Sequence, residues 1–188
     1  MTSPWPGTTA LAEYQSGDPQ AALDAAISLI QGYCGWHIAP SRDDDVVLDG
    51  SGHYIQSLPT LMLTAITDVV DDDVALTDDD YDWSEDGYMI RVTTSTLSQS
   101  TNARGWTYKL RSVTATITHG YAELPGELYS AALVIATLAQ TPASAITSQT
   151  AGPYSIQMAT RSDGVPVGIY LPNDIRSILD KYKIQGVA

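Results

Sequence analysis

The sequence has no Phe, a single Cys and no long apolar run. One Cys, at position 34, excludes an internal disulfide and is typical of a reducing compartment. No stretch of about 18 apolar residues occurs, so we expect neither a membrane-spanning helix nor a membrane partner. Residues 1–17 lack the basic start and apolar run of a signal peptide, which predicts a protein made and folded in a cytoplasm.

Basic residues are also scarce: the chain has 9 Lys and Arg against 22 Asp and Glu, for a net charge of −13. Proteins that grip nucleic acid through phosphates gain affinity from Lys and Arg, so this balance argues against that class. An acidic surface instead suits DNA that slides past without sticking, because like charges repel.

Apolar residues follow helical spacing towards both ends of the chain, and between these parts apolar and polar residues alternate. Asp18-Pro19 is a helix-start signal, and apolar residues at spacings of three and four predict a helix over 19–33. The same spacing predicts helices over 126–140 and 172–183. Between them, turn signals predict hairpins at 46–58 and 81–92 and one long strand over 106–118.

These patterns predict an α+β fold. We expect a small helical bundle, with two main helices and a short C-terminal helix, carrying an inserted antiparallel β sandwich or barrel-like block. The expected parts are an extended N-terminal arm (1–17), a helical core (18–42 and 121–188) with a long loop (142–171), and an inserted β subdomain (43–120).

Catalytic and metal chemistry finds little support. Cys34 and His37 have the spacing of half a zinc site, but no second pair of ligands exists. A nucleophilic Cys–His pair needs an exposed, activated thiol, whereas we interpret Cys34 as a core residue. The Asp triplets at 43–45, 71–73 and 78–80 lack calcium-loop spacing and are interpreted as turns and solvated caps. We therefore predict no enzyme activity, no cofactor and no metal.

Two segments remain candidates for contacts with other proteins. Tyr154, Ile156 and Met158 alternate within the long loop, either covering the core or forming an edge that pairs with a neighbouring subunit or partner. The basic cluster Arg104, Lys109 and Arg111 is either a solvated face or a contact to an acidic neighbour.

Five segments, in this order, resemble the head–tail connector (adaptor, or head-completion) proteins of tailed bacteriophages, in the subtype with an inserted β region. They are AALDAAISLIQGYCGWHIAP (21–40), VVLDGSGHYIQSLPTLMLTAITDV (46–69), DDDYDWSEDGYMIR (78–91), VTATITHGYAELP (113–125) and LPNDIRSILDKYK (171–183).

The resemblance implies a structural virion protein of the neck, assembled in the host cytoplasm. Such adaptors form a ring, typically of twelve copies, beneath the portal; the ring extends the DNA channel and joins the next neck component. The implied partners are the portal protein, the stopper protein and other copies of the chain, while genomic DNA passes through the lumen without specific binding.

Site residues follow from the resemblance as hypotheses. Segment 171–188 is expected to dock onto the portal, with Ile175, Ile178, Leu179 and Tyr182 as anchors. Tyr154, Ile156 and Met158 are expected to contact a neighbouring subunit or the stopper. Two alternatives from other classes stay open: a monomeric β-rich ligand- or cation-binding module, and a small hydrolase with an acidic cleft.

Overall fold

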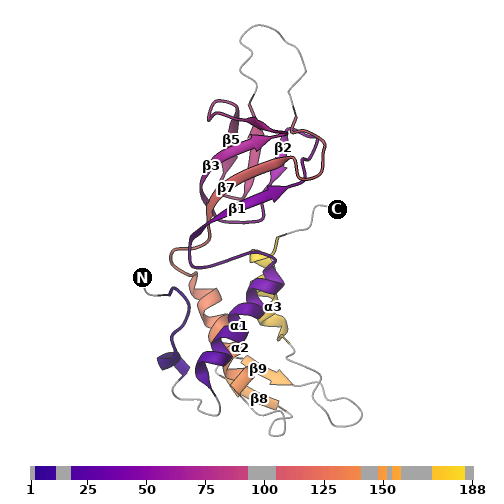
Figure 1. The fold of residues 1–188 in the computed structure, drawn as a ribbon. Coiled ribbons are helices and arrows are strands. Elements are labelled where there is room, and N and C mark those ends of the chain that lie inside the picture. The colour runs from indigo at the N-terminus through magenta and orange to yellow at the C-terminus, as the bar shows by residue number, and fades with distance from the viewer. Residues whose placement is uncertain are drawn as a thin grey trace. The chain divides into compact units, whose positions relative to one another are not determined.

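A computed structural model describes residues 3–11, 18–92, 105–140, 148–151, 154–157 and 171–184. The chain divides into two compact units, a helical unit (Met1–Trp36 with Glu123–Ala188) and a β unit (His37–Ala122) (Figure 1). Residues 37–42 and 121–122, which the sequence analysis assigned to the helical core, belong to the β unit. The elements confirm the α+β class.

The first helix of the helical unit, α1 (Pro19–Cys34), begins at the predicted residue and ends one residue beyond the predicted end at 33. The Asp18 side chain accepts a bond from the backbone N–H of Gln20 at 3.0 Å, which satisfies one unpaired donor of the first turn. Gly35 ends the helix in the left-handed conformation, with φ of 81°, and its N–H donates to the carbonyl of Gln31.

The second helix, α2 (Gly126–Gln140), packs against α1. Its buried face contains the small residues Ala131, Ala132 and Ala136, which allow the two backbones to approach closely. The short α3 (Asn173–Leu179) packs against both helices and continues into the 3-10 helix η2 (Asp180–Tyr182).

Two segments of the helical unit differ from the sequence analysis. The expected N-terminal arm contains a 3-10 helix, η1 (Thr8–Leu11), and buries Trp5 and Leu11. The expected long loop contains an antiparallel hairpin of β8 (Ser148–Ala151) and β9 (Tyr154–Gln157). The 3-10 helix is too short for a periodic pattern to reveal it, whereas the alternation of Tyr154 and Ile156 coincides with β9.

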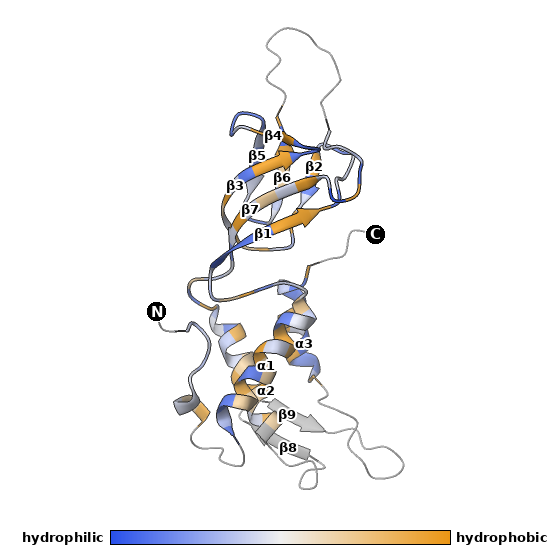
Figure 2. Ribbon diagram, viewed as in Figure 1, coloured by the Kyte–Doolittle hydropathy of each residue, from blue (hydrophilic) through white to orange (hydrophobic). Residues whose placement is uncertain are grey.

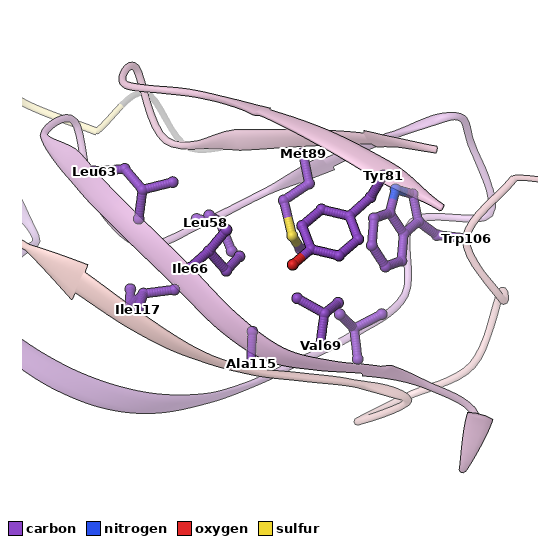
Figure 3. Close-up of a cluster of buried hydrophobic side chains, with 10 residues drawn as sticks. Leu58, Leu63, Ile66, Val69, Tyr81, Met89, Trp106, Ala115 and Ile117 are labelled. Atoms are coloured by element: carbon purple, nitrogen blue, oxygen red, sulfur yellow. The ribbon is translucent and has the colours of Figure 1, made fainter. Parts of the chain in front are cut away.

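The β unit consists of two antiparallel sheets. The four-stranded sheet has the order β1 (Arg42–Leu48), β7 (Val113–His119), β3 (Leu63–Asp71) and β4 (Val74–Ala75). The three-stranded sheet has the order β2 (Ile55–Ser57), β6 (Tyr88–Arg91) and β5 (Tyr81–Ser84). Figure 3 shows side chains from both sheets converging on one core, which includes Ile117, Val69, Met89, Tyr81 and Trp106.

Strand pairing corrects part of the sequence analysis. The hairpin expected at 46–58 is wrong, because β1 pairs with β7 and β2 pairs with β6. The long strand expected over 106–118 begins only at Val113. The hairpin of β5 and β6 is confirmed. Along β7, alternate residues are buried, and they include Val113, Ala115 and Ile117.

Candidate interaction surfaces

Cys34 lies at the end of α1 with its side chain fully buried. Its Sγ is 3.8 Å from the carbonyl oxygen of Leu179. Burial raises the pKa of this thiol to about 11, so the thiolate that a nucleophile or zinc ligand requires is disfavoured. The structure therefore places Cys34 in the core, as the sequence analysis interpreted it.

His37 belongs to the β unit and has a structural partner of its own. Its Nε2 lies 2.6 Å from the carbonyl oxygen of Pro40, and its ring meets that of His119 edge-on with centroids 5.9 Å apart. Burial lowers the pKa of His37 below its ordinary value. Among the residues that the structure describes, no group of three or more His, Cys, Asp or Glu side chains could hold a metal ion.

The buried imidazole of His119 fixes the beginning of β1. Its Nε2 lies 2.9 Å from Oδ2 of Asp44, which also accepts a bond from Nε of Arg42 at 2.8 Å. The hydrogen bond from His119 is the main cause that lowers the pKa of the Asp44 carboxyl, and Arg42 adds to it. These contacts join β1 to its neighbour β7. The Asp triplet at 43–45 is therefore part of the sheet as well as solvated.

A set of contacts, here called the C-terminal clasp, ties residues 179–184 to the end of α1. The Tyr33 hydroxyl donates to Asp180 at 2.5 Å, and the Trp36 indole N–H donates to the carbonyl of Tyr182 at 2.7 Å. The backbone N–H of Ile184 donates to the carbonyl of Cys34 at 3.0 Å. Tyr33 and Trp36 therefore position the end of the chain.

The start of α2 completes the C-terminal clasp through one carboxylate. Glu127 accepts a bond from the Tyr182 hydroxyl at 2.6 Å and pairs with Nζ of Lys181 at 2.8 Å. Lys181 and then Tyr182 lower the pKa of Glu127 by hydrogen bonding. The last described residues of the chain are thus held by both main helices.

The four residues expected to dock onto the portal have unequal exposure. Ile175 and Leu179 are 1% and 0% exposed, and they belong to the core of the helical unit. Ile178 and Tyr182 are half-buried and retain accessible surface. Burial gives Ile175 and Leu179 a role in folding, so only the other two offer a side chain to a partner.

The second predicted contact segment is only partly described. Tyr154 and Ile156 lie in β9, which pairs with β8 of the same chain. Met158 lies outside the described residues.

The most exposed large apolar side chains belong to a surface that we call the loop tip, formed by residues 49–54 and 105–112. Tyr108 is 89% exposed and Leu110 is 76% exposed, and Tyr54 is exposed beside them. Lys109 and Arg111 alternate with the two apolar residues, and Lys109 pairs with Asp72. Arg104, the third member of the basic cluster, lies outside the described residues.

Backbone bonds between its two segments make the loop tip rigid. The backbone N–H of Gly50 donates to the carbonyl of Lys109 at 2.9 Å, and that of Trp106 donates to the carbonyl of His53 at 2.8 Å. The backbone N–H of Arg111 donates to the Asp49 carboxylate at 2.8 Å. The approach at Gly50 is so close that a Cβ there would lie 1.8 Å from the carbonyl oxygen of Thr107. Only glycine permits this contact.

A buried polar group lies beneath the loop tip. The Asp71 carboxylate accepts the Thr107 N–H at 3.2 and 3.3 Å and lies 4.0 Å from a guanidinium nitrogen of Arg91. The Arg91 guanidinium stacks over the Trp106 ring at 5.3 Å. Within the described part of the chain, Nη1 of Arg91 and Nε1 of Trp106 have no acceptor.

The outer face of the four-stranded sheet is polar. Asp43 and Asp45 of β1 accept bonds from the hydroxyls of Thr118 and Thr116 on β7, at 2.6 and 2.7 Å, and all four side chains share one face. Val47 extends this face and is half-exposed. Figure 2 shows the change along β1 from a hydrophilic first half to a hydrophobic end.

The basic residues of the loop tip were recognisable as a candidate contact, but its exposed apolar residues were not, because they imitate a strand. Tyr108, Lys109, Leu110 and Arg111 alternate apolar and basic, which is the pattern of a half-buried strand. Gly105 lies just before the expected strand and does not interrupt it, so it gave no signal against the strand. Arg111 in fact adopts a positive φ of 55°, outside the extended region of regular strand residues.

Comparison with known proteins identifies the fold. No protein-family model and no curated protein matches the chain. A chain in a structure of the neck of the native gene transfer agent (GTA) particle, computed with C12 symmetry, is 16% identical over 100% of this chain and 98% of its own, with a TM-score of 0.56.

Two further structures give similar values. A chain from the neck of the empty GTA particle, computed with C6 symmetry, is 16% identical over 97% of this chain and 93% of its own, with a TM-score of 0.55. A chain from the virion of the native particle is 17% identical over 96% and 93%, with a TM-score of 0.54. This protein therefore shares its fold, over essentially its whole length, with chains of a phage-like particle. None of its described helices is long and apolar enough to cross a membrane.

Proposed function

We propose that this chain is a structural neck protein of a tailed, phage-like particle: a head-to-tail adaptor that forms a ring of twelve copies beneath the portal. The observation that carries the proposal is the full-length match, in both directions, to a chain from a GTA neck structure. Both units of the chain take part in that match, so the likeness is not that of one common small domain.

The ring is supported by the symmetry of the similar assembly and by the surface of this chain. The neck of the native GTA particle was computed with C12 symmetry. Here the β unit presents highly exposed Tyr108 and Leu110 on a rigid loop, a composition typical of protein–protein contacts. The chain acts without catalysis, and its partners are the portal, the stopper and further copies of itself.

The net charge of −13 supports a role as a DNA conduit. A ring of such subunits repels phosphates, so genomic DNA passes through the lumen without being held. The ring extends the channel of the portal and joins it to the next neck component. The protein is assembled onto heads in the host cytoplasm and stays in the virion.

Portal docking is proposed for the C-terminal segment, 171–188. Ile178 and Tyr182 supply its contacts, while Ile175 and Leu179 hold α3 in the helical unit. The C-terminal clasp supports this role, because it presents residues 179–184 in one conformation and so lowers the entropy lost on docking. Tyr154, Ile156 and Met158 are proposed to contact a neighbouring subunit or the stopper.

Co-sedimentation with cognate, DNA-filled, tailless heads tests the function. We expect stoichiometric binding and a ring at one vertex in electron micrographs. Absence of binding to cognate heads would overturn the adaptor role.

A substitution in α3 tests the docking segment. Ile178→Ser should weaken binding to heads, whereas Ser177→Thr, on the exposed side of the same helix, should bind like the wild type. Thermal melts of both variants show whether the helical unit is intact. Wild-type binding by a folded Ile178→Ser variant would place the portal contact elsewhere.

A further inference from the structure

We infer that the loop tip is the surface by which each copy of this chain grips the next, and that it seats on the outer face of β1 in the neighbouring copy. The inference rests on the proposed function, since a ring requires contacts between copies. It adds which two surfaces meet and the chemistry that joins them.

The loop tip has the properties of a preorganised contact. Tyr108 and Leu110 are more exposed than any other large apolar residue described. Hydrogen bonds at Gly50 and Trp106 nevertheless fix the backbone that carries them. Exposed apolar side chains on a fixed backbone bind with little loss of conformational entropy. A loop needs no such rigidity when its side chains only face solvent.

Charge selects the kind of surface that the loop tip meets. Copies with a net charge of −13 repel one another, so their contact needs basic groups on one side. Of the 9 basic residues in the chain, Lys109 and Arg111 lie in the loop tip and alternate with Tyr108 and Leu110. An acidic surface with an apolar margin complements this arrangement.

The outer face of β1 is such a surface. Asp43, Asp45 and Val47 alternate along one side of the strand, and all three are exposed. Val47 offers apolar area to Leu110 or Tyr108, while the two carboxylates offer partners to Arg111. Bonds from Thr116 and Thr118 hold those carboxylates in place.

The two surfaces also satisfy the geometry of a ring. A closed ring larger than a dimer is built from heterologous contacts, in which one patch of each copy meets a different patch of the next. The loop tip and the outer face of β1 are different patches of one β unit, so every copy carries both halves of the contact.

Disulfide trapping between two single-cysteine variants tests the contact. Leu110→Cys and Asp45→Cys are purified separately, mixed, bound to tailless heads and oxidised. No chain carries both new thiols, so any mixed dimer joins two copies, and native Cys34 is buried and contributes little background. We expect mixed dimers in the mixture and none when either variant is bound alone.

The controls separate this inference from the proposed function. If neither wild type nor variants bind heads, the adaptor role fails. If all bind as rings without mixed dimers, the adaptor role stands and the proposed contact is wrong. Dimers of Leu110→Cys alone would show that like surfaces meet, which also overturns the contact.

A charge exchange provides an independent readout. Arg111→Glu should reduce ring formation on heads, and adding Asp45→Arg to the same chain should restore it, because the opposite charges then face each other across the contact. Asp82→Arg, an exposed acidic site on β5, serves as the matched control and should not restore assembly. If Asp82→Arg restores ring formation as well as Asp45→Arg does, the rescue depends on net charge alone, and the proposed pairing of Arg111 with Asp45 is wrong.

Discussion

At the scale of single residues, Trp106 shows how a buried polar atom affects stability. Its ring is 2% exposed, and among the described residues its Nε1 has no acceptor. Trp106→Phe therefore loses volume but no hydrogen bond, and we expect a loss of about 1–2 kcal/mol, against about 3–5 kcal/mol for Trp106→Ala. Urea unfolding followed by far-ultraviolet circular dichroism measures both. A loss for Trp106→Phe well above about 2 kcal/mol would contradict the unpaired state of Nε1, because this change would then also break a hydrogen bond.

His37 should make the β unit sensitive to mild acid. Burial lowers its native pKa below the value of 6.5, so the unfolded chain takes up a proton more readily. The contribution of neutral His37 to the stability of the β unit is therefore present above pH 6.5. It is lost as the pH falls through the lower native pKa of His37.

Melting temperatures measured between pH 7.5 and 5 test this sign. The wild type should lose stability over this range, and His37→Gln should lose less, because Gln carries no titrating group. Asp44, whose pKa is lowered from 3.8, contributes only in more acidic solution and does not interfere. A variant with the same pH dependence as the wild type would rule out His37 as the group responsible.

At the scale of elements, local signals predicted well and distant pairing did not. The cap at Asp18, the stop at Gly35 and the stripe between them define α1 without reference to the rest of the chain. Strand β1 was recognised by its alternation, but its partner β7 lies far along the sequence. Alternation shows which face is buried and carries no information on which strand is next.

The role of α3 is a prediction at this same scale. Leu179 is fully buried, so Leu179→Ala should lower the free energy of unfolding of the helical unit by about 2–5 kcal/mol. Ser177→Ala, exposed on the same helix, should change it by less than about 0.5 kcal/mol. Chemical denaturation followed by helical circular dichroism compares them. If Leu179→Ala leaves the free energy of unfolding unchanged, α3 contributes little to the core of the helical unit.

At the scale of the whole molecule, surfaces are harder to infer from the sequence than changes of period. A helical frame around a β insertion follows from the change of period near residues 43 and 120. The loop tip depends on Gly50 approaching the backbone of Thr107, a contact between distant segments. Two of the four predicted docking residues, Ile175 and Leu179, prove buried, because an apolar stripe on a short helix does not reveal what it packs against.

Two units with separate cores should unfold separately. The β-unit core, including Met89, Val69 and Ile117, draws only on residues between His37 and Ala122, and every strand of both its sheets pairs within that range. Among the described residues, none from the helical unit completes a ladder or belongs to that core. Residues 37–122 produced alone should therefore fold, with the near-ultraviolet signal of a packed Trp106.

Calorimetry of the full chain tests the same independence without cutting it. Met89→Ala should lower the melting of the β unit, at a cost of about 2–5 kcal/mol, and leave the transition of the helical unit unchanged. Leu179→Ala should do the reverse. If both variants shift one common transition by similar amounts, the two units do not unfold independently.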